Sequence, residues 1–307
     1  MAKFKRNQSI QGTGTGTAVR VGLFAALIAG IIGVYNFFTN STPTNDPNAA
    51  LVTEEVVTPA DEVDDQENYL PTSTTGAIVQ HKYYALSYHE RHEQAEWVAY
   101  VLTRERLQMP WQDRPDLFEA DPRVRSGSAT LSDYRGSGYD RGHLVPAADM
   151  AFNTTAITET FFLSNISPQS RDFNKGIWKE LEELTRDWAI KFKKLYVVTG
   201  PVLKDGGKGT IGNNEVTIPT AFYKVLLDLS EPDQKAIAFI VPNEVSYDPL
   251  FKYAVSIDEV EKQTGINFFP NLMTRELERE LEAQKNIDFW PFSKKKFDLR
   301  VNQWNKE

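Results

Sequence analysis

The chain has 307 residues, of which 41% are hydrophobic and 12% aromatic, enough to bury one large core or two smaller ones. It contains no cysteine, which excludes disulfide bonds and thiolate metal sites. The net charge is −8, and proteins that bind nucleic acid are usually basic, so the overall charge argues at first sight against that class of partner.

The N-terminal part predicts a membrane anchor. Residues 1–20 hold four basic residues and no acid, and residues 21–38 hold no charge at all. At about 1.5 Å per residue, this uncharged stretch nearly matches a hydrocarbon core of roughly 30 Å. We therefore predict a basic cytoplasmic tail and one transmembrane helix in the lipid bilayer, with a cleaved signal peptide as the alternative. Because the basic residues come first, the rest of the chain is expected to be extracytoplasmic, in a bacterial periplasm or at the mitochondrial inner membrane.

Residues 39–76 are predicted to form a disordered tether. They are rich in Thr, Asn, Pro and acidic residues and poor in large apolar ones, so they cannot bury enough surface to order themselves. Residues 1–76 contain eight acidic and four basic residues, which leaves a net charge of −4 for the rest of the chain. The folded part is therefore close to neutral, and any basic surface on it must be local.

Residues 77–307 are predicted to form one α+β domain. Helical spacing of apolar residues predicts a helix between Ile177 and Phe192. In "SIDE", Ser256 is placed to cap a second helix that Gly265 would end. The link "SEPDQ" predicts that the last two strands form an antiparallel hairpin. Strands are predicted in "YYALSYHERHEQAEWVAYVLT" (two around a polar turn), "KLYVVTGPVL", "AFYKVLLDL" and "KAIAFIVPN".

Two other motifs suggest chemistry but have simpler interpretations. "GGKGT" around Lys208 resembles a phosphate-binding loop, but Val at position 202 and Gly at position 209 break the required pattern, so we predict a surface turn. His81, His89 and His92 lie close together in sequence and could bind a transition metal. Because "HERHEQ" falls where two strands turn, we predict solvated turn histidines instead.

The fourth histidine, His143, stands in the densest mixture of charge and glycine, "DYRGSGYDRGHLVPAADM". Taken residue by residue, His143 could simply end a strand, and Asp140 and Arg141 could form a local ion pair. Downstream, Asn165 in "SNISPQ" could be a turn residue, and Asn174 could be the N-cap of the long helix. These structural interpretations remain open at this level.

The spacing within the long helix adds a second observation. Asn174, Trp178 and Glu182 are four residues apart, so they run along one side of the helix. An amide at the start of the helix and a carboxylate two turns later would then face the same direction.

Four motifs in order resemble the DNA/RNA non-specific endonuclease family, the endonuclease G-like group with the DRGH signature. They are "DRGH", "SN-x-x-PQ", "N-x-x-x-W-x-x-LE" and "TGP", and the similarity spans the whole predicted domain. The resemblance implies an α+β ββα-metal nuclease fold, with a central antiparallel sheet flanked by helices, here preceded by the transmembrane helix. It also implies DNA and RNA as substrates. Members of the family often form dimers, so a homodimer is included among the expected assemblies, although no residue proves it.

The resemblance assigns roles to particular residues. His143 is implied as the general base that activates water, and Asn174 as the direct protein ligand of Mg²⁺, with Mn²⁺ as an alternative. Glu182 is implied to hold the metal through water, and Arg141 and Asn165 to support the site and the phosphate. Physical chemistry agrees, because a neutral imidazole accepts a proton near pH 7 and Mg²⁺ prefers oxygen ligands while keeping most of its waters.

Further candidates are Asp140, Arg186 and, for an arginine that the family has upstream of the motif, Arg114. Residues 123–142 hold four arginines against two aspartates, so a local positive charge exists in an otherwise acidic chain. Water as nucleophile implies hydrolysis to 5′-phosphate ends in both DNA and RNA.

Two other functions remain as alternatives. One is a membrane-tethered binding or scaffold protein on a nuclease-like fold, which the intact His143, Asn174 and Glu182 argue against. The other is a metal-dependent phosphodiesterase that acts on a small or lipid-linked substrate.

Overall fold

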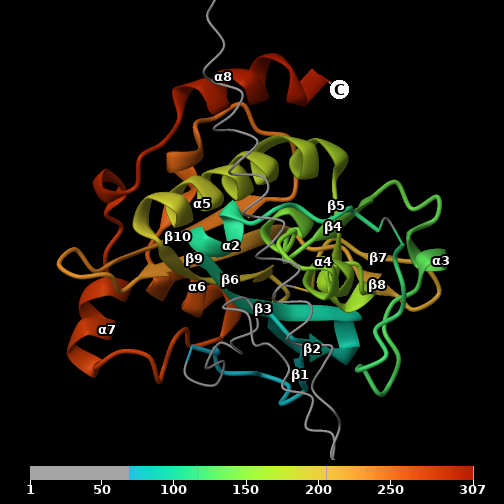
Figure 1. The fold of residues 1–307 in the computed structure, drawn as a ribbon. Helices are drawn as coiled ribbons and strands as arrows, with labels where there is room; N and C mark the ends of the chain where they lie inside the picture. Colours follow the sequence, from blue (N-terminus) through green and yellow to red (C-terminus); the bar gives the residue numbers. More distant parts are fainter. Residues whose placement is uncertain (1–68, 116, 205, 307) are drawn as a thin grey trace, which may run out of the picture. The chain divides into compact units, whose positions relative to one another are not determined.

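The structure is a computed structural model and describes residues 69–115, 117–204 and 206–306 (Figure 1). The basic tail, the membrane helix predicted at residues 21–38 and residues 39–68 of the predicted tether lie outside these described residues. Within the described ranges, the structure contains no helix with the length and apolarity needed to cross a bilayer.

A large antiparallel sheet forms the centre of the domain. It has seven strands in the order β1-β2-β3-β6-β9-β10-β11, and every neighbouring pair is antiparallel. The predicted hairpin is confirmed, with Asp228 opposite Lys235. The strands are β1 (Ile78–Gln80), β2 (Ala85–His89), β3 (Gln94–Thr103), β6 (Lys194–Pro201), β9 (Ala221–Asp228), β10 (Lys235–Pro242) and β11 (Ala254–Val255).

The sheet is buried on both faces. Successive side chains of a strand point to opposite sides, so one strand can contribute to both cores. In β3, Val98 and Tyr100 join one hydrophobic core, whereas Trp97 and Ala99 join another. The first core is covered by α2 (Arg104–Gln108) and α5 (Lys179–Phe192), and the second by α6 (Ile257–Thr264) and α7 (Arg275–Glu282). Figure 1 shows α5 and the α6/α7 pair on opposite sides of the sheet. The prediction of an α+β domain with a central antiparallel sheet flanked by helices is confirmed.

A smaller layer lies beside the α5 face. β4 (Asp140–His143) pairs antiparallel with β5 (Ile166–Gln169), and β5 leads through a π-helical turn, η4 (Phe173–Trp178), into α5. This gives a strand–strand–helix order at the site of the DRGH motif. The remaining elements are α3 (Leu131–Tyr134), α4 (Thr154–Glu159), β7 (Thr210–Ile211), β8 (Val216–Thr217), α8 (Lys294–Asn302) and the 3₁₀ turns η1 (Glu90–His92), η2 (Ala147–Asp149), η3 (Leu163–Asn165), η5 (Leu250–Tyr253), η6 (Ile287–Phe289) and η7 (Trp304–Lys306).

The folded domain begins earlier than residue 77. Residues 69–76, which their composition assigned to the tether, pack against the sheet. Tyr69 is only 1% exposed and belongs to the core on the α6/α7 face. The indole Nε1 of Trp97 donates to the carbonyl of Thr72 at 2.9 Å, and the amide of Thr72 donates to the carbonyl of Asn267 at 2.9 Å. These partners are distant in sequence, so local composition did not reveal them.

The predicted limits of α6 are confirmed. The hydroxyl of Ser256 accepts a hydrogen bond from the amide of Glu259 at 3.2 Å, and Gly265 ends the helix with a φ of 80° in the left-handed region. The turn around Lys208 is also confirmed as an exposed surface turn, in which Gly207 and Gly209 have positive φ.

The prediction of solvated turn histidines is wrong for two of the three. His81 is buried, with its Nε2 3.1 Å from Oδ2 of Asp121, and His92 is buried, with its Nδ1 2.9 Å from Oγ1 of Thr217. Each partner comes from a segment far along the chain, which turn chemistry alone does not indicate. In the part of the chain that the structure describes, the three histidines do not form a metal-ligating group.

Candidate active site

The DRGH strand is held tightly against its neighbour. In β4, His143 lies opposite Ile166 in the β4–β5 pair. A Cβ atom at Gly142 would lie 2.0 Å from Cδ of Gln169, so any other residue there would force the buried Gln169 side chain to move. Upstream, Gly136 has a φ of 70°, which glycine adopts easily, in the turn that leads into the strand. The glycines of this segment therefore allow a close approach and a tight turn.

Two phenylalanines support the basic side chains of the site. The ring of His143 lies 4.9 Å from Phe161 edge-on and 5.6 Å from Phe118. The guanidinium of Arg141 lies over the Phe118 ring at 4.3 Å, and that of Arg114 over the Phe161 ring at 5.0 Å. This aromatic pair, whose centroids are 5.0 Å apart, thus contacts all three candidates. Sequence reasoning missed both phenylalanines, because apolar residues between motifs resemble ordinary core positions.

Asn174 is not the N-cap of the long helix, so the capping interpretation is wrong. The N-cap of α5 is Trp178, and Asn174 lies inside the preceding π-helical turn η4, with its amide donating to the carbonyl of Ser170 at 2.9 Å. Its side-chain Nδ2 donates to Oδ2 of Asp140 at 3.1 Å. This bond uses the N–H group of the amide and leaves the Oδ1 oxygen as the atom that can coordinate a cation.

The π-helical turn around Asn174 has a local cause. Gly176 has φ −97° and ψ −110°, which is not helical, and it interrupts the regular path of the helix. A Cβ at this position would lie 2.6 Å from Oδ1 of Asn305. Such π-helical turns are frequent at functional sites. The glycine two residues after Asn174 is the signal in the sequence that could have indicated it.

Asp140 does not form the ion pair with Arg141 that its position next to that arginine suggested. Its carboxylate accepts from Asn174 and lies 3.7 Å from Nη1 of Arg171, while Arg141 lies over the Phe118 ring. Asp140 therefore orients the amide of Asn174 from the neighbouring strand.

Farther along α5, Arg186 is fixed by a buried carboxylate. Its Nη1 donates to Oδ1 of Asp149 at 2.9 Å, and Oδ2 of Asp149 accepts from the hydroxyl of Tyr100 at 2.7 Å. Burial lowers the pKa of Arg186, but the carboxylates of Asp149 and Glu182 outweigh burial and leave that pKa raised. Arg186 is therefore a permanent cation here. Asp149 and Tyr100 were not predicted: Tyr100 lies on β3, far from the motifs, and Asp149 lies just after the DRGH motif but at a position to which the motif assigns no role.

Glu182 lies one helical turn before Arg186 and is partly exposed. Burial raises its pKa to about 7, against the opposing effect of Arg186 and of Lys224. Lys224, on β9, is fully buried and donates to Oγ1 of Thr199 at 2.6 Å. Burial lowers the pKa of Lys224 to about 8, and Glu182 acts in the opposite direction. The sequence analysis did not predict a role for Lys224, because its neighbours in the strand are mostly apolar and no motif includes it.

Asn165 supports the backbone and does not reach a substrate. It is fully buried, its Oδ1 accepts from the amide of Val145 at 2.9 Å, and its Nδ2 donates to the carbonyls of Val145 at 3.1 Å and Thr160 at 2.8 Å. Asn165 was predicted to support the site and the phosphate; its hydrogen-bonding groups are used on the main chain, and it does not line the cleft. It holds the segment that follows His143.

One cleft of about 320 Å³ brings most of the predicted residues together. It adjoins a second cavity of about 660 Å³ that Asp140 lines, and Arg114, Arg141 and Asn174 border both. Six basic side chains against three acidic ones border the two cavities. Of the four arginines in residues 123–142 that predicted a local positive charge, only Arg135 and Arg141 are among them, since Arg123 and Arg125 line a separate pocket. Predicted residues that line the smaller cleft are Arg114, Arg141, His143, Asn174, Glu182 and Arg186. The basic set is Arg114, Arg135, Arg141, Lys175, Lys179 and Arg186, and the acidic set is Asp140, Glu182 and Glu183.

Comparison with known proteins places this chain in a family. Residues 65–275 match the DNA/RNA non-specific endonuclease family. The chain belongs to this family. It is 37% identical over 227 residues to Nuclease EXOG, mitochondrial, of Danio rerio, covering 68% of this chain and 66% of the relative. It is 38% identical over 215 residues to Nuclease C1 of Cunninghamella echinulata var. echinulata, covering 65% of this chain and 85% of the relative.

A solved structure shows the same relationship. A chain in the crystal structure of the EndoG/EndoGI complex superposes with a TM-score of 0.60 at 32% sequence identity, covering 65% of this chain and 87% of the other. Endonuclease G, mitochondrial, of Homo sapiens is 36% identical over 205 residues, covering 62% of this chain and 69% of the relative. The chain spans just under two thirds of the Danio rerio EXOG and 63% of the Xenopus laevis EXOG.

Proposed function

We propose that this member of the family is a metal-dependent endonuclease that hydrolyses phosphodiester bonds of both DNA and RNA. The observation that supports this most is the convergence of three kinds of group on one cleft. An imidazole (His143), an amide oxygen oriented for coordination (Asn174) and several guanidinium groups line the same space. A phosphodiester is anionic, so its hydrolysis requires a base for water and positive charge for the phosphate.

His143 acts as the general base in this proposal. It lies at the end of β4, half-buried, with its ring held by Phe161 and Phe118. A neutral imidazole accepts a proton from water as the water attacks phosphorus. Asn165 contributes by holding the backbone after His143, so it acts as a positioning residue.

The residues of the cleft fit a divalent cation that prefers oxygen ligands. The Oδ1 atom of Asn174 supplies the direct contact, Glu182 holds the cation through water, and Asp140 fixes the orientation of the Asn174 amide. One amide oxygen with carboxylate support suits Mg²⁺, which keeps several waters, and Mn²⁺ is the alternative. When bound, the cation stabilises negative charge on the phosphate and on the departing oxygen.

The arginines bind the phosphate backbone. Arg141 and Arg114 lie over the aromatic pair at the edge of the cleft, and Asp149 holds Arg186 on the helix side. Guanidinium groups contact phosphate oxygens without distinguishing bases or sugars. We therefore expect little sequence preference, no need for a 2′-hydroxyl, 5′-phosphate products and activity that falls steeply with added salt.

We also propose that residues 21–38 anchor the enzyme in a membrane with residues 1–20 in the cytoplasm. The nuclease domain would then be extracytoplasmic, on the periplasmic side in a bacterium or at the inner membrane in a mitochondrion. Several relatives are named as mitochondrial proteins, which supports the second setting if the source is eukaryotic. Protease added to spheroplasts or mitoplasts should release a domain that retains activity. Complete protection of the domain would contradict this orientation, and gel filtration of the released domain would test the expected homodimer.

Cleavage of supercoiled plasmid and of a long RNA, with and without Mg²⁺, tests the catalytic proposal. His143→Ala should lower the rate by about 10²–10⁴-fold, because it removes the base, whereas the matched change His89→Ala outside the cleft should leave the rate unchanged. Loss of less than tenfold would reject His143 as the base. Absence of cleavage by the unaltered protein would favour a scaffold role. Cleavage of a small phosphodiester but not of plasmid would favour the other alternative, and a 2′,3′-cyclic phosphate on RNA would exclude water as the nucleophile.

A further inference from the structure

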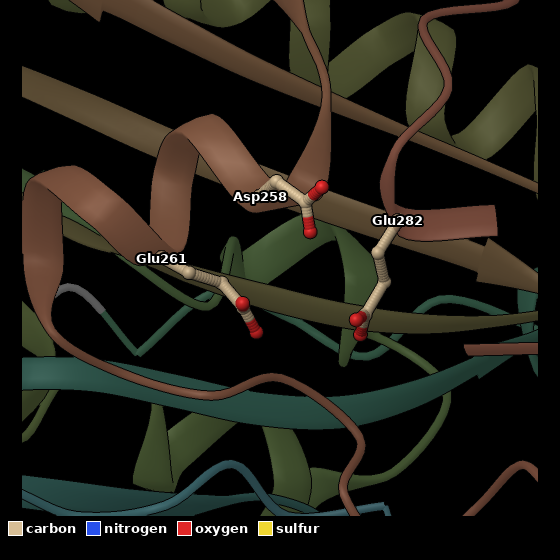
Figure 2. A group of neighbouring side chains, drawn as sticks. All are labelled: Asp258, Glu261 and Glu282. Carbon is tan, nitrogen blue, oxygen red and sulfur yellow. The ribbon is translucent and has the colours of Figure 1, made fainter. Parts of the chain in front are cut away.

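Three carboxylates converge on the face of the sheet opposite the cleft. Asp258 and Glu261 lie on α6, and Glu282 is the last residue of α7. One oxygen from each lies within 4.8 Å of the others, and Figure 2 shows all three side chains directed toward a common space. None of the three lines the nuclease cleft.

Glu282 distinguishes this group from an ordinary cluster of acidic residues on the surface, because it is buried. Its residue is only 5% exposed, and its Oε1 atom is buried without a hydrogen-bond partner. Burial raises the pKa of this carboxyl to about 8, and the charged neighbours that add to the effect, Glu261, Glu278 and Asp258, are all acidic. A buried carboxylate without a partner is unfavourable unless something neutralises it.

The arrangement around Glu282 favours a cation over a shared proton. The amide of Phe268 donates to Oε1 of Glu261 at 2.9 Å, which holds that carboxylate in place from the far side. Asp258 is exposed, so an ion can reach the cluster from solvent. A proton can be shared by only two carboxylates, whereas three oxygens around one space match the way a divalent ion is bound.

We propose that Asp258, Glu261 and Glu282 bind a calcium ion. Calcium takes six to eight oxygen ligands at about 2.3–2.6 Å, so oxygens on one shell can lie up to about 5 Å apart. Magnesium binds at about 2.0–2.1 Å, which limits that separation to about 4 Å and demands stricter octahedral geometry. All three oxygens lie within 4.8 Å of one another, which fits a calcium shell. Three protein carboxylates are also more than the one or two that Mg²⁺ usually takes, so the cluster suits calcium, with water completing the shell.

Such an ion would connect α6, which lies inside the family match, to the end of α7, which lies beyond it. The family match ends at residue 275, so α6 lies inside it and Glu282 lies beyond it. Both helices pack on β10 and contribute to the same hydrophobic core. Calcium would connect the end of α7 to α6 and stabilise the C-terminal segment, separately from the nuclease reaction.

Titration calorimetry and thermal unfolding of the full-length chain with CaCl₂ test this site. The protein carries Asn174→Ala, which removes the direct ligand proposed for the nuclease cation. We expect one calcium ion per chain and a rise in Tm of about 5 °C when calcium is a hundredfold above its Kd. Adding Glu282→Gln should weaken calcium binding at least tenfold and reduce the Tm response at the same calcium concentration to half or less. Adding the matched change Glu259→Gln, on α6 but outside the cluster, should leave both intact.

The proposal is overturned if calcium does not bind, or if Glu282→Gln and Glu259→Gln respond to calcium alike; Glu282 would then carry a proton. If Glu282→Gln fails to fold, Asp258→Asn provides the same comparison. In the chain with Asn174 intact, Glu282→Gln should cleave plasmid at the unaltered rate in saturating Mg²⁺. Failure of the calcium site is thus distinguishable from failure of the nuclease assignment.

Discussion

Two carboxylates on opposite faces of the sheet, the half-buried Glu182 and the buried Glu282, show how desolvation can have different consequences. Burial raises the pKa of Glu182 to about 7 and that of Glu282 to about 8. Around Glu182, Arg186 and Lys224 oppose the rise, whereas every charged neighbour that acts on Glu282 increases it. The chain itself supplies positive charge beneath the cleft, while at the α6/α7 face the positive charge has to come from solution.

Asp121 shows the opposite outcome, in which its partners outweigh burial. It is buried, and burial alone would raise its pKa, but hydrogen bonds from His81 and Ser164 outweigh burial and leave that pKa lowered. At Glu182, by contrast, Arg186 and Lys224 reduce the effect of burial but do not outweigh it. The comparison therefore runs from a fully compensated carboxylate to an uncompensated one.

The largest expected effect is at the buried pair of His81 and Asp121. Burial lowers the pKa of His81, but the hydrogen bonds and charges of Asp121 and Glu159 outweigh it, so its folded-state pKa is raised. Its stabilisation is therefore complete below about pH 6.5 and is lost as pH rises through the folded-state pKa. His81→Asn should lower the free energy of unfolding by about 3–5 kcal/mol at pH 6, and by less at pH 9.

Urea unfolding at the two pH values measures the effect of His81→Asn, with His89→Asn as the control for a partly exposed histidine. Equal destabilisation at pH 6 and pH 9 would show that the charged pair with Asp121 does not contribute.

The next effect concerns the cleft itself. Asn174→Ala should lower the cleavage rate by about 100-fold and increase the Mg²⁺ concentration needed for half-maximal rate, because it removes the direct oxygen ligand. Circular dichroism should show an unchanged helix content, since Asn174 is not a cap. Asn302→Ala, at the exposed end of α8, serves as the control. An unchanged Mg²⁺ dependence would remove Asn174 from the metal site.

A smaller effect is expected when the ion pair that holds Arg186 is weakened and the proposed metal ligand is kept. Asp149→Asn keeps the shape of the side chain but removes the charge that holds Arg186. We expect kcat to fall by about tenfold with KM little changed, because Arg186 is then less well placed in the transition state. Asp187→Asn, exposed on α5, should have no effect. A change in KM alone would indicate a role in substrate binding only.

The smallest effect lies on the other face. Ser256→Ala removes the side-chain cap of α6 and should destabilise the domain by about 1 kcal/mol, a fall in Tm of about 2–4 °C. Plasmid cleavage at 25 °C should be unchanged, since α6 does not border the cleft. Exposed Ser132→Ala should leave Tm unaltered, and a loss of activity in Ser256→Ala would show that the two faces are coupled.

Local patterns in the sequence determined much of this protein. The strand and helix periodicities, the cap at Ser256 and the end at Gly265 depend on neighbours within a few residues, so they could be predicted and are confirmed. The ordered motifs identified the family, and the candidates of the cleft, apart from Asn165, do come together around its two cavities.

Tertiary structure alone decided which side chains support those candidates. Phe118 and Phe161 beneath His143, Asp149 beside Arg186 and Lys224 beneath Glu182 come from segments far apart in the chain. The burial of Asn165, the ordered residues 69–76 and the buried partners of His81 and His92 were likewise hidden. Desolvation and electrostatic interaction depend on what lies nearby in space, and no local window of sequence contains that information.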